Sequence, residues 1–217
     1  MYFAIASAII AVACSAITIK TLVGYSDIRR SRKIIVGLLV VVGWFAPLLV
    51  GLVRDSGLFG PEAFAVVSKI LYLMFGTVFI LFSMLLFRDV VWFALYWIYS
   101  KIFGENWKLH PKNINLLDKA NFIVVLLTAV LASMAVYGGA REPELKRLEF
   151  ASARISKDMR IVMINDTHIN RTTPVETVRK LVDRVNALDA DAIVLVGDIA
   201  DDKVDACLLY TSPSPRD

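Results

Sequence analysis

The chain has 217 residues, of which 57% are hydrophobic and 20% are charged, and its two cysteines exclude a disulfide framework or a cysteine metal site. The charge is uneven, because residues 1–140 hold 12 Lys and Arg against 6 Asp and Glu, whereas residues 141–217 hold 12 against 14. Excess positive charge in the hydrophobic part indicates loops that flank membrane spans, so we expect no nucleic-acid binding.

Four segments without a charged residue are long enough to cross a hydrocarbon core about 30 Å thick. They are residues 2–19, 34–53, 70–87 and 120–137, within a membrane domain of residues 1–140. The third run continues past Arg88 and Asp89 into an aromatic-rich stretch, which we interpret as an interfacial helix or a tilted prolongation. We expect Arg88 and Asp89 to extend to the membrane interface rather than to mark an ion pathway.

Two further features of the membrane domain lead to predictions. Gly43, Pro47 and Gly51 fall on one helical face, which predicts helix packing with a proline kink. Basic residues are concentrated in the first and third connecting loops, which predicts that these loops are cytoplasmic. We therefore expect an integral protein of a bacterial inner or plasma membrane, with the lipid bilayer as a partner and the domain after Tyr137 outside the cytoplasm.

After a charged connector, residues 141–159, the pattern becomes that of an α/β unit. Residues 148–155 predict an edge strand, and the β-branched run 161–164 predicts a buried strand. Residues 173–176, Thr-Pro-Val-Glu, predict a capping box at the start of a helix. A second strand is expected at residues 192–196, and a crossover of this length implies parallel pairing.

Polar residues follow both predicted strands. Asp166 and His168 come after the first, and Gly197 and Asp198 come after the second. Because the carboxyl ends of parallel strands meet at one edge, two carboxylates and one imidazole should lie close enough to share a cation. Such a mixed oxygen and nitrogen set suits Mn, Fe, Zn or Mg, and Gly197 allows a sharp turn beside it. Each feature alone is weak, since Gly-Asp after a strand is commonly an ordinary turn.

Together, Asp166-Thr167-His168 and the Gly-Asp-Ile-Ala-Asp sequence of residues 197–201 resemble the opening signature of the calcineurin-like metallophosphoesterases, in particular their membrane-anchored bacterial members. The resemblance implies a two-sheet β-sandwich flanked by helices, of which residues 160–206 would be the N-terminal βαβ portion. It also implies that Asp166 and His168 bind one divalent metal ion, that Asp198 bridges to a second, and that Asp201 supports the site. The implied activity is hydrolysis of phosphate mono- or diesters by two-metal activation of water. A site tethered outside the membrane would suit lipid-linked phosphoesters as substrates.

The later Gly-Asn-His motif of that family and its further histidines are missing, since His168 is the only histidine after residue 110. Residues 207–217 read Cys-Leu-Leu-Tyr-Thr-Ser-Pro-Ser-Pro-Arg-Asp, which resembles a translated transposase adapter from sequencing libraries. We therefore expect the native sequence to stop near Ala206 and the chain to be an inactive fragment without a catalytic histidine.

Two alternatives stay open. One is a four-span transporter or scaffold with an incidental tail, and the other is a non-catalytic sensor that binds a metal ion or phosphate. A transporter requires polar residues along a path through the spans. Polar side chains in or next to the spans are few, chiefly Thr18, Ser68, Thr77, Ser83, Thr128 and Ser133, and such residues are common in membrane-helix packing.

Overall fold

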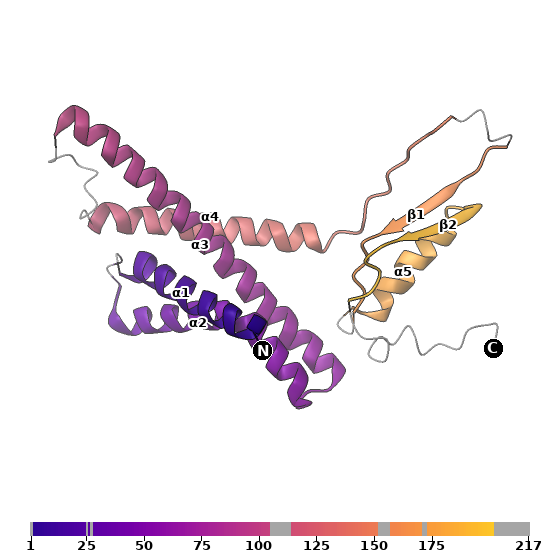
Figure 1. Cartoon of the computed structure of the whole chain (residues 1–217), viewed down its shortest axis with the longest axis horizontal. Helices are drawn as coiled ribbons and strands as arrows, with labels where there is room; N and C mark the ends of the chain where they lie inside the picture. Colours follow the sequence, from indigo (N-terminus) through magenta and orange to yellow (C-terminus); the bar gives the residue numbers. More distant parts are fainter. Residues whose placement is uncertain are drawn as a thin grey trace. The chain divides into compact units, whose positions relative to one another are not determined.

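A computed structural model describes residues 2–24, 26, 28–104, 114–151, 157–170 and 173–201. The chain divides into two compact units (Figure 1). One consists of Met1–Leu58 and Val67–Pro143, and the other consists of Phe59–Val66 and the described residues from Glu144 onward. The predicted adapter-derived tail, residues 207–217, lies outside the described residues.

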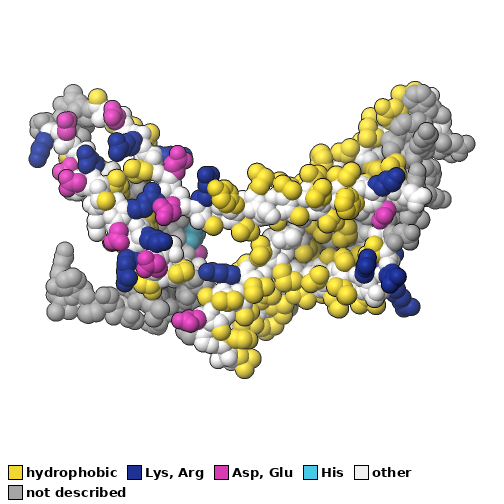
Figure 2. Space-filling view, turned by 180° about the vertical axis from the view of Figure 1, so that it is seen from behind, with side chains coloured by type: hydrophobic (Ala, Val, Ile, Leu, Met, Phe, Trp, Pro, Cys, Tyr) yellow, Lys and Arg dark blue, Asp and Glu magenta, His cyan; other side chains and the backbone are white. Residues whose placement is uncertain are grey.

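Four long hydrophobic helices dominate the first unit, and each is long enough to cross a membrane. They are α1 (Tyr2–Val23), α2 (Arg30–Ser56), α3 (Pro61–Phe103) and α4 (Ile114–Gly139). Each contains one of the predicted spans but extends beyond it, because main-chain hydrogen bonding continues after the uncharged run ends. The stretch after Arg88 belongs to α3, a single helix of 43 residues. Figure 2 shows hydrophobic side chains over much of the visible surface of these helices, as expected for a surface that faces lipid.

Two clusters of buried side chains hold the helices together. The first joins α1, α3 and α4 through Leu22, Val23, Leu81, Leu85 and Val124. The second joins α1, α2 and α3 through Ala11, Val40, Trp44 and Val78. The Trp44 indole is surrounded edge-on by the rings of Phe75, Phe79 and Phe82, and its N–H donates to the Thr18 hydroxyl at 3.3 Å.

Gly43 allows α2 and α3 to approach closely. A Cβ atom at this position would lie 2.6 Å from Cγ2 of Val78 and 3.3 Å from the main-chain oxygen of Met74. At Gly51, no described heavy atom lies within 4 Å of such a Cβ. The predicted helix packing is therefore confirmed at Gly43, whereas Gly51 faces open space.

The side chain of Arg88 does not extend outward from the helices, as a side chain reaching for the membrane interface would. Its side chain is 8% exposed, and its guanidinium donates to the side-chain carbonyl of Asn121 on α4 and to Asp89. The Asn121 amide in turn donates to the main-chain oxygens of Thr21 at 3.4 Å and Leu22 at 3.1 Å, in the last turn of α1. Arg88 stays inside because Asn121 supplies a buried acceptor, which removes the cost of burying an unpaired charge. We call Arg88, Asp89 and Asn121 the Arg88 cluster.

The second unit contains β1 (Ile161–Asn165), α5 (Val175–Asn186) and β2 (Ala192–Val196). The strands pair in parallel, from Ile161 opposite Ala192 to Asn165 opposite Val196, so the predicted strand–helix–strand unit is confirmed. The prediction that the first strand is buried is wrong, since Ile161 and Met163 are more than half exposed, and Leu195 in β2 is exposed to a similar degree. The described residues provide only one helix, α5, alongside this sheet, and one helix cannot cover both faces.

Two local predictions in this unit are also corrected. The predicted capping box is absent, because Pro174 occupies the N-cap position without a side-chain hydrogen bond. The Thr173 hydroxyl instead accepts a hydrogen bond from the Asn170 N–H at 3.1 Å, within the turn before the helix. In the predicted edge strand, residues 148–151 form no strand and expose Leu148 and Phe150, and residues 152–156 lie outside the described residues.

Candidate metal centre

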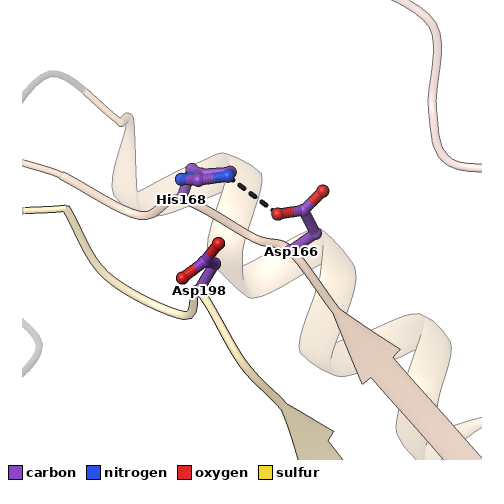
Figure 3. Close-up of side chains that lie close together, drawn as sticks. All are labelled: Asp166, His168 and Asp198. Carbon is purple, nitrogen blue, oxygen red and sulfur yellow. Dashed lines mark ion pairs between the residues drawn. The ribbon is translucent and has the colours of Figure 1, made fainter.

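Asp166, His168 and Asp198 come together beyond the carboxyl ends of β1 and β2 (Figure 3). Asp166 directly follows β1, and Asp198 follows β2 after one glycine. Since Asn165 pairs with Val196, the two strands end at the same level and deliver their following residues to the same place. The three residues predicted to bind metal are therefore close in space.

Main-chain hydrogen bonds keep the two loops side by side after the strands end. The His168 N–H donates to the Asp198 carbonyl at 2.9 Å, and the Ile169 N–H donates to the Ile199 carbonyl at 2.9 Å. The Thr167 hydroxyl also donates to the Ile199 carbonyl, at 2.8 Å. These bonds fix the spacing between the loop carrying Asp166 and His168 and the loop carrying Asp198.

The backbone at the site has an unusual conformation. Asp166, His168 and Asp198 have φ angles of 64°, 45° and 43°, and Gly197 has a φ of 58°. Glycine adopts this left-handed region freely, whereas for other residues it costs about 1–2 kcal/mol each. Concentration of such residues at one point is typical of functional sites, where the backbone directs side chains against its local preference.

The spacing of the donor atoms is close to what a metal ion requires. Nε2 of His168 lies 2.8 Å from Oδ1 of Asp166, and one donor atom from each of Asp166, His168 and Asp198 lies within 4.8 Å of the others. Ligand atoms bonded about 2.1 Å from one ion lie about 3–4.3 Å apart, so small side-chain movements would accommodate a divalent cation. Two carboxylates and one imidazole form a donor set suited to Mn, Fe, Zn or Mg.

Asp201, predicted as a supporting residue, lies on the other side of the imidazole. Its Oδ1 is 2.8 Å from Nδ1 of His168, and its N–H donates to the Ile169 carbonyl at 3.0 Å. A carboxylate bound to one ring nitrogen fixes the orientation of the ring and leaves the other nitrogen for a metal. Asp201 therefore directs Nε2 of His168 toward Asp166.

The neighbouring carboxylates also change the acidity of His168. The hydrogen bond to Asp201 and the charge of Asp201 raise the pKa of His168 above its ordinary value of 6.5, and Asp166 adds to this effect. The side chains of Asp166 and His168 are 62% and 49% exposed, so ions in solution can reach them. The site is thus an open, negatively charged cluster around one basic nitrogen.

Sequence reasoning did not assign roles to two residues near the site. The Thr167 hydroxyl joins the two loops, and the Asn170 side-chain amide donates to the His168 carbonyl at 3.3 Å. Both residue types are common in ordinary turns, so their sequence positions provide no signal of these contacts.

Comparison with known proteins identifies relatives of two kinds. The chain is 27% identical over 133 residues to an uncharacterized metallophosphoesterase of Campylobacter jejuni, covering 61% of this chain and 34% of that protein. It is 28% identical over 85 residues to a transmembrane protein with metallophosphoesterase domain from Danio rerio, covering 38% of this chain and 20% of that protein. A protein of the same name from Bos taurus is 29% identical over 96 residues, covering 43% of this chain and 21% of that protein.

No family model and no solved structure matches the chain. The chain spans about a fifth to a third of the length of these curated relatives. Their names support the metallophosphoesterase family, and the transmembrane relatives together with the four hydrophobic helices indicate a membrane protein.

Proposed function

We propose that the chain is the membrane-anchored, metal-binding part of a phosphoesterase that hydrolyses phosphate mono- or diesters. The convergence of Asp166, His168 and Asp198 at the carboxyl edge of a parallel strand pair carries this proposal. The names of the curated relatives support it. The two-sheet β-sandwich of the metallophosphoesterases belongs to the proposal, with residues 160–206 as its first βαβ portion.

Each site residue has a proposed role. Asp166 and His168 would bind the first of two divalent cations, and Asp198 would bridge to the second. When bound, such cations polarise a phosphoryl oxygen and lower the pKa of a water molecule that attacks phosphorus. Asp201 would hold the His168 ring through Nδ1, and Gly197 would supply the left-handed turn that brings Asp198 to the site.

The location of the site suggests a substrate class. Basic residues in the first and third loops support a cytoplasmic position for these loops and an extracytoplasmic position for the unit that follows α4. We propose the bacterial inner membrane as the location. A site tethered to that membrane would meet lipid-linked phosphoesters, which we propose as one class of substrate.

The transporter alternative finds little support in the described residues. The hydroxyls of Thr77, Ser83 and Ser133 donate to the carbonyl oxygen four residues earlier in their own helices. A hydroxyl satisfied in this way does not require a polar path through the membrane. The sensor alternative is distinguished from an enzyme by turnover, which the following experiment measures.

Manganese-dependent hydrolysis of bis(p-nitrophenyl) phosphate and p-nitrophenyl phosphate tests the proposed function. The 217-residue chain should show no turnover above its Asp198→Ala variant, because the sequence offers no second histidine in this unit to protonate a leaving group. A longer protein that contains this sequence together with the later histidines of the metallophosphoesterases should hydrolyse at least one of these esters, and Asp198→Ala should abolish that activity. Asp183→Ala, which changes an exposed carboxylate on α5, is the matched control. Metal binding by such a longer protein without turnover would instead indicate a sensor.

A further inference from the structure

One end of the helical unit carries a dense set of positive charges. Residues 20–33 contain five Lys and Arg against one acidic residue. We call these five cations, together with one at the start of α4, the basic end: Lys20, Arg29, Arg30, Arg32, Lys33 and Lys119. Five of the six are exposed, and within the described part of the chain none is paired with a carboxylate. By contrast, Arg54 near the other end of α2 forms an ion pair with Asp55 at 3.0 Å.

The six cations lie at the same end of the unit. Lys20 is in the last turn of α1, and α2 begins directly after the connecting loop with Arg30. The hydrogen bonds from Asn121 to Thr21 and Leu22 place the beginning of α4, with Lys119, beside the end of α1. Figure 2 shows Lys and Arg side chains gathered at one end of the helices.

The charges at the start of α2 oppose formation of that helix, whereas Lys20 in the last turn of α1 suits its helix dipole. The first turn of α2 contains no acidic residue, and Arg29 at its N-cap makes no side-chain capping bond. Positive side chains at a helix N-terminus oppose the helix dipole, and neighbouring cations repel one another. The cations at the start of α2 are therefore unfavourable within the chain alone and become favourable beside an anionic partner.

A hydrophobic segment extends past the basic end. Arg88 bonds to Asn121, which bonds to the last turn of α1, so Arg88 lies at the height of that turn. Residues 89–103 continue α3 beyond this height by about 22 Å. Val90 and Phe93 in this segment are each 67% exposed. The whole of α3 is about 64 Å long, twice the thickness of the hydrocarbon core, so this segment must lie in or along the interfacial region.

We propose that the basic end binds the headgroups of anionic phospholipids in the leaflet that it faces, with residues 89–103 of α3 inserted beside them at the interface. Phosphate groups of the lipid complement Lys and Arg side chains that have no carboxylate partner among the described residues. Acyl chains cover the exposed hydrophobic residues that a soluble anion would leave in water. Arg88 is not part of this surface, because Asp89 and Asn121 occupy its guanidinium.

The relative association of spin-labelled phosphatidylglycerol and phosphatidylcholine with the reconstituted 217-residue chain tests this proposal. The wild-type chain should prefer phosphatidylglycerol, and high salt should weaken that preference. Combined Arg29→Gln, Arg30→Gln and Arg32→Gln substitutions should reduce the preference by about fivefold or more, the effect expected from one cation at a headgroup. The matched control combines Lys146→Gln, Arg147→Gln and Lys157→Gln, which removes the same charge from exposed residues outside the helical unit.

Three outcomes would overturn the proposal. The first is a wild-type chain without preference for phosphatidylglycerol, a result that requires no variant to fold. The second is an equal loss in the basic-end variant and in the control, which would indicate a general effect of net charge. The third is displacement of the labelled lipid by millimolar inorganic phosphate, which would indicate a site for soluble anions.

Discussion

His168 lies between Asp166 and Asp201, and a proton on its ring competes with a metal ion. A histidine must be neutral to bind metal, and the two carboxylates raise the pKa of His168 above 6.5. The protonated ring therefore stabilises the metal-free unit below the unfolded-state pKa, and this contribution is lost as pH rises through the higher folded-state pKa. Metal binding has the opposite dependence and should strengthen as pH rises.

We expect the Mn²⁺ affinity of the chain to rise with pH from about pH 5.5 and to level off once pH exceeds the raised pKa of His168. Titration of Mn²⁺ at several pH values measures this dependence. His168→Gln should bind weakly with a flatter pH profile. A wild-type affinity that stays constant across this range would contradict the role of His168 as a ligand.

Asp201 is expected to act through His168 rather than by contacting the metal. Asp201→Ala removes the acceptor from Nδ1 and frees the ring, so metal affinity should fall about tenfold or more. Asp201→Asn keeps an oxygen that accepts from Nδ1–H and should restore most of the affinity. Metal titration tests whether the affinity falls strongly in Asp201→Ala and only slightly in Asp201→Asn. Equal affinities of Asp201→Ala and wild type would show that the ring does not need the hydrogen bond to Asp201.

At the scale of single helices, Gly43 and Gly51 in α2 form a matched pair. Gly43→Ala would place a methyl group 2.6 Å from Cγ2 of Val78, and overpacking of this kind costs about 1–3 kcal/mol. Gly51→Ala meets no described atom within 4 Å and should change stability by less than about 1 kcal/mol. Thermal unfolding in detergent micelles compares the two, and equal effects would contradict close packing of α2 on α3 at Gly43.

The Arg88 cluster predicts that substitutions at two positions of α4, Asn121 and Thr128, differ in their effect on stability. Asn121→Leu leaves the buried Arg88 guanidinium and two α1 carbonyls without this partner, which should destabilise the helical unit by about 1–3 kcal/mol. Thr128→Val is the control, because the Thr128 hydroxyl is buried without a partner among the described residues and its loss should be neutral or stabilising. Unfolding of both variants in detergent measures the contrast, and a neutral Asn121→Leu would show that the cluster does not hold the helices together.

Helix and strand types were predictable where one local pattern dominates. Uncharged hydrophobic runs of membrane length predicted the four helices, and two short β-branched runs around an amphipathic segment predicted β1, α5 and β2. The approach of Asp166, His168 and Asp198 also followed, because parallel pairing fixes which loop residues meet.

The errors all depend on distant partners or on competing local bonds. Burial of Arg88 depends on Asn121, which lies 33 residues away and has no pattern that marks it as an acceptor. Thr173 matches a capping box, yet its hydroxyl bonds to Asn170 instead. Burial of the strands requires elements on both faces, and a hydrophobic run does not report how many faces are covered.

The whole molecule combines hydrophobic helices of membrane length with an exposed candidate metal centre. Four hydrophobic helices and the basic end belong to the first unit, and the candidate metal centre belongs to the second. The phosphoesterase proposal depends on the second unit alone, whereas the phospholipid proposal depends on the first. If an experiment contradicts one of the two proposals, the other is therefore unaffected.

The claim on which the function rests is that Asp166, His168 and Asp198 bind a divalent cation. Titration of Mn²⁺ into the 217-residue chain, followed by the loss of the free-ion electron paramagnetic resonance signal, tests it most directly. The wild type and the Asp183→Ala control should bind with equal affinity, and Asp198→Ala should bind more than about a hundredfold more weakly. Equal Mn²⁺ affinity in the wild type and Asp198→Ala, or no binding by the wild type, would contradict the metal centre.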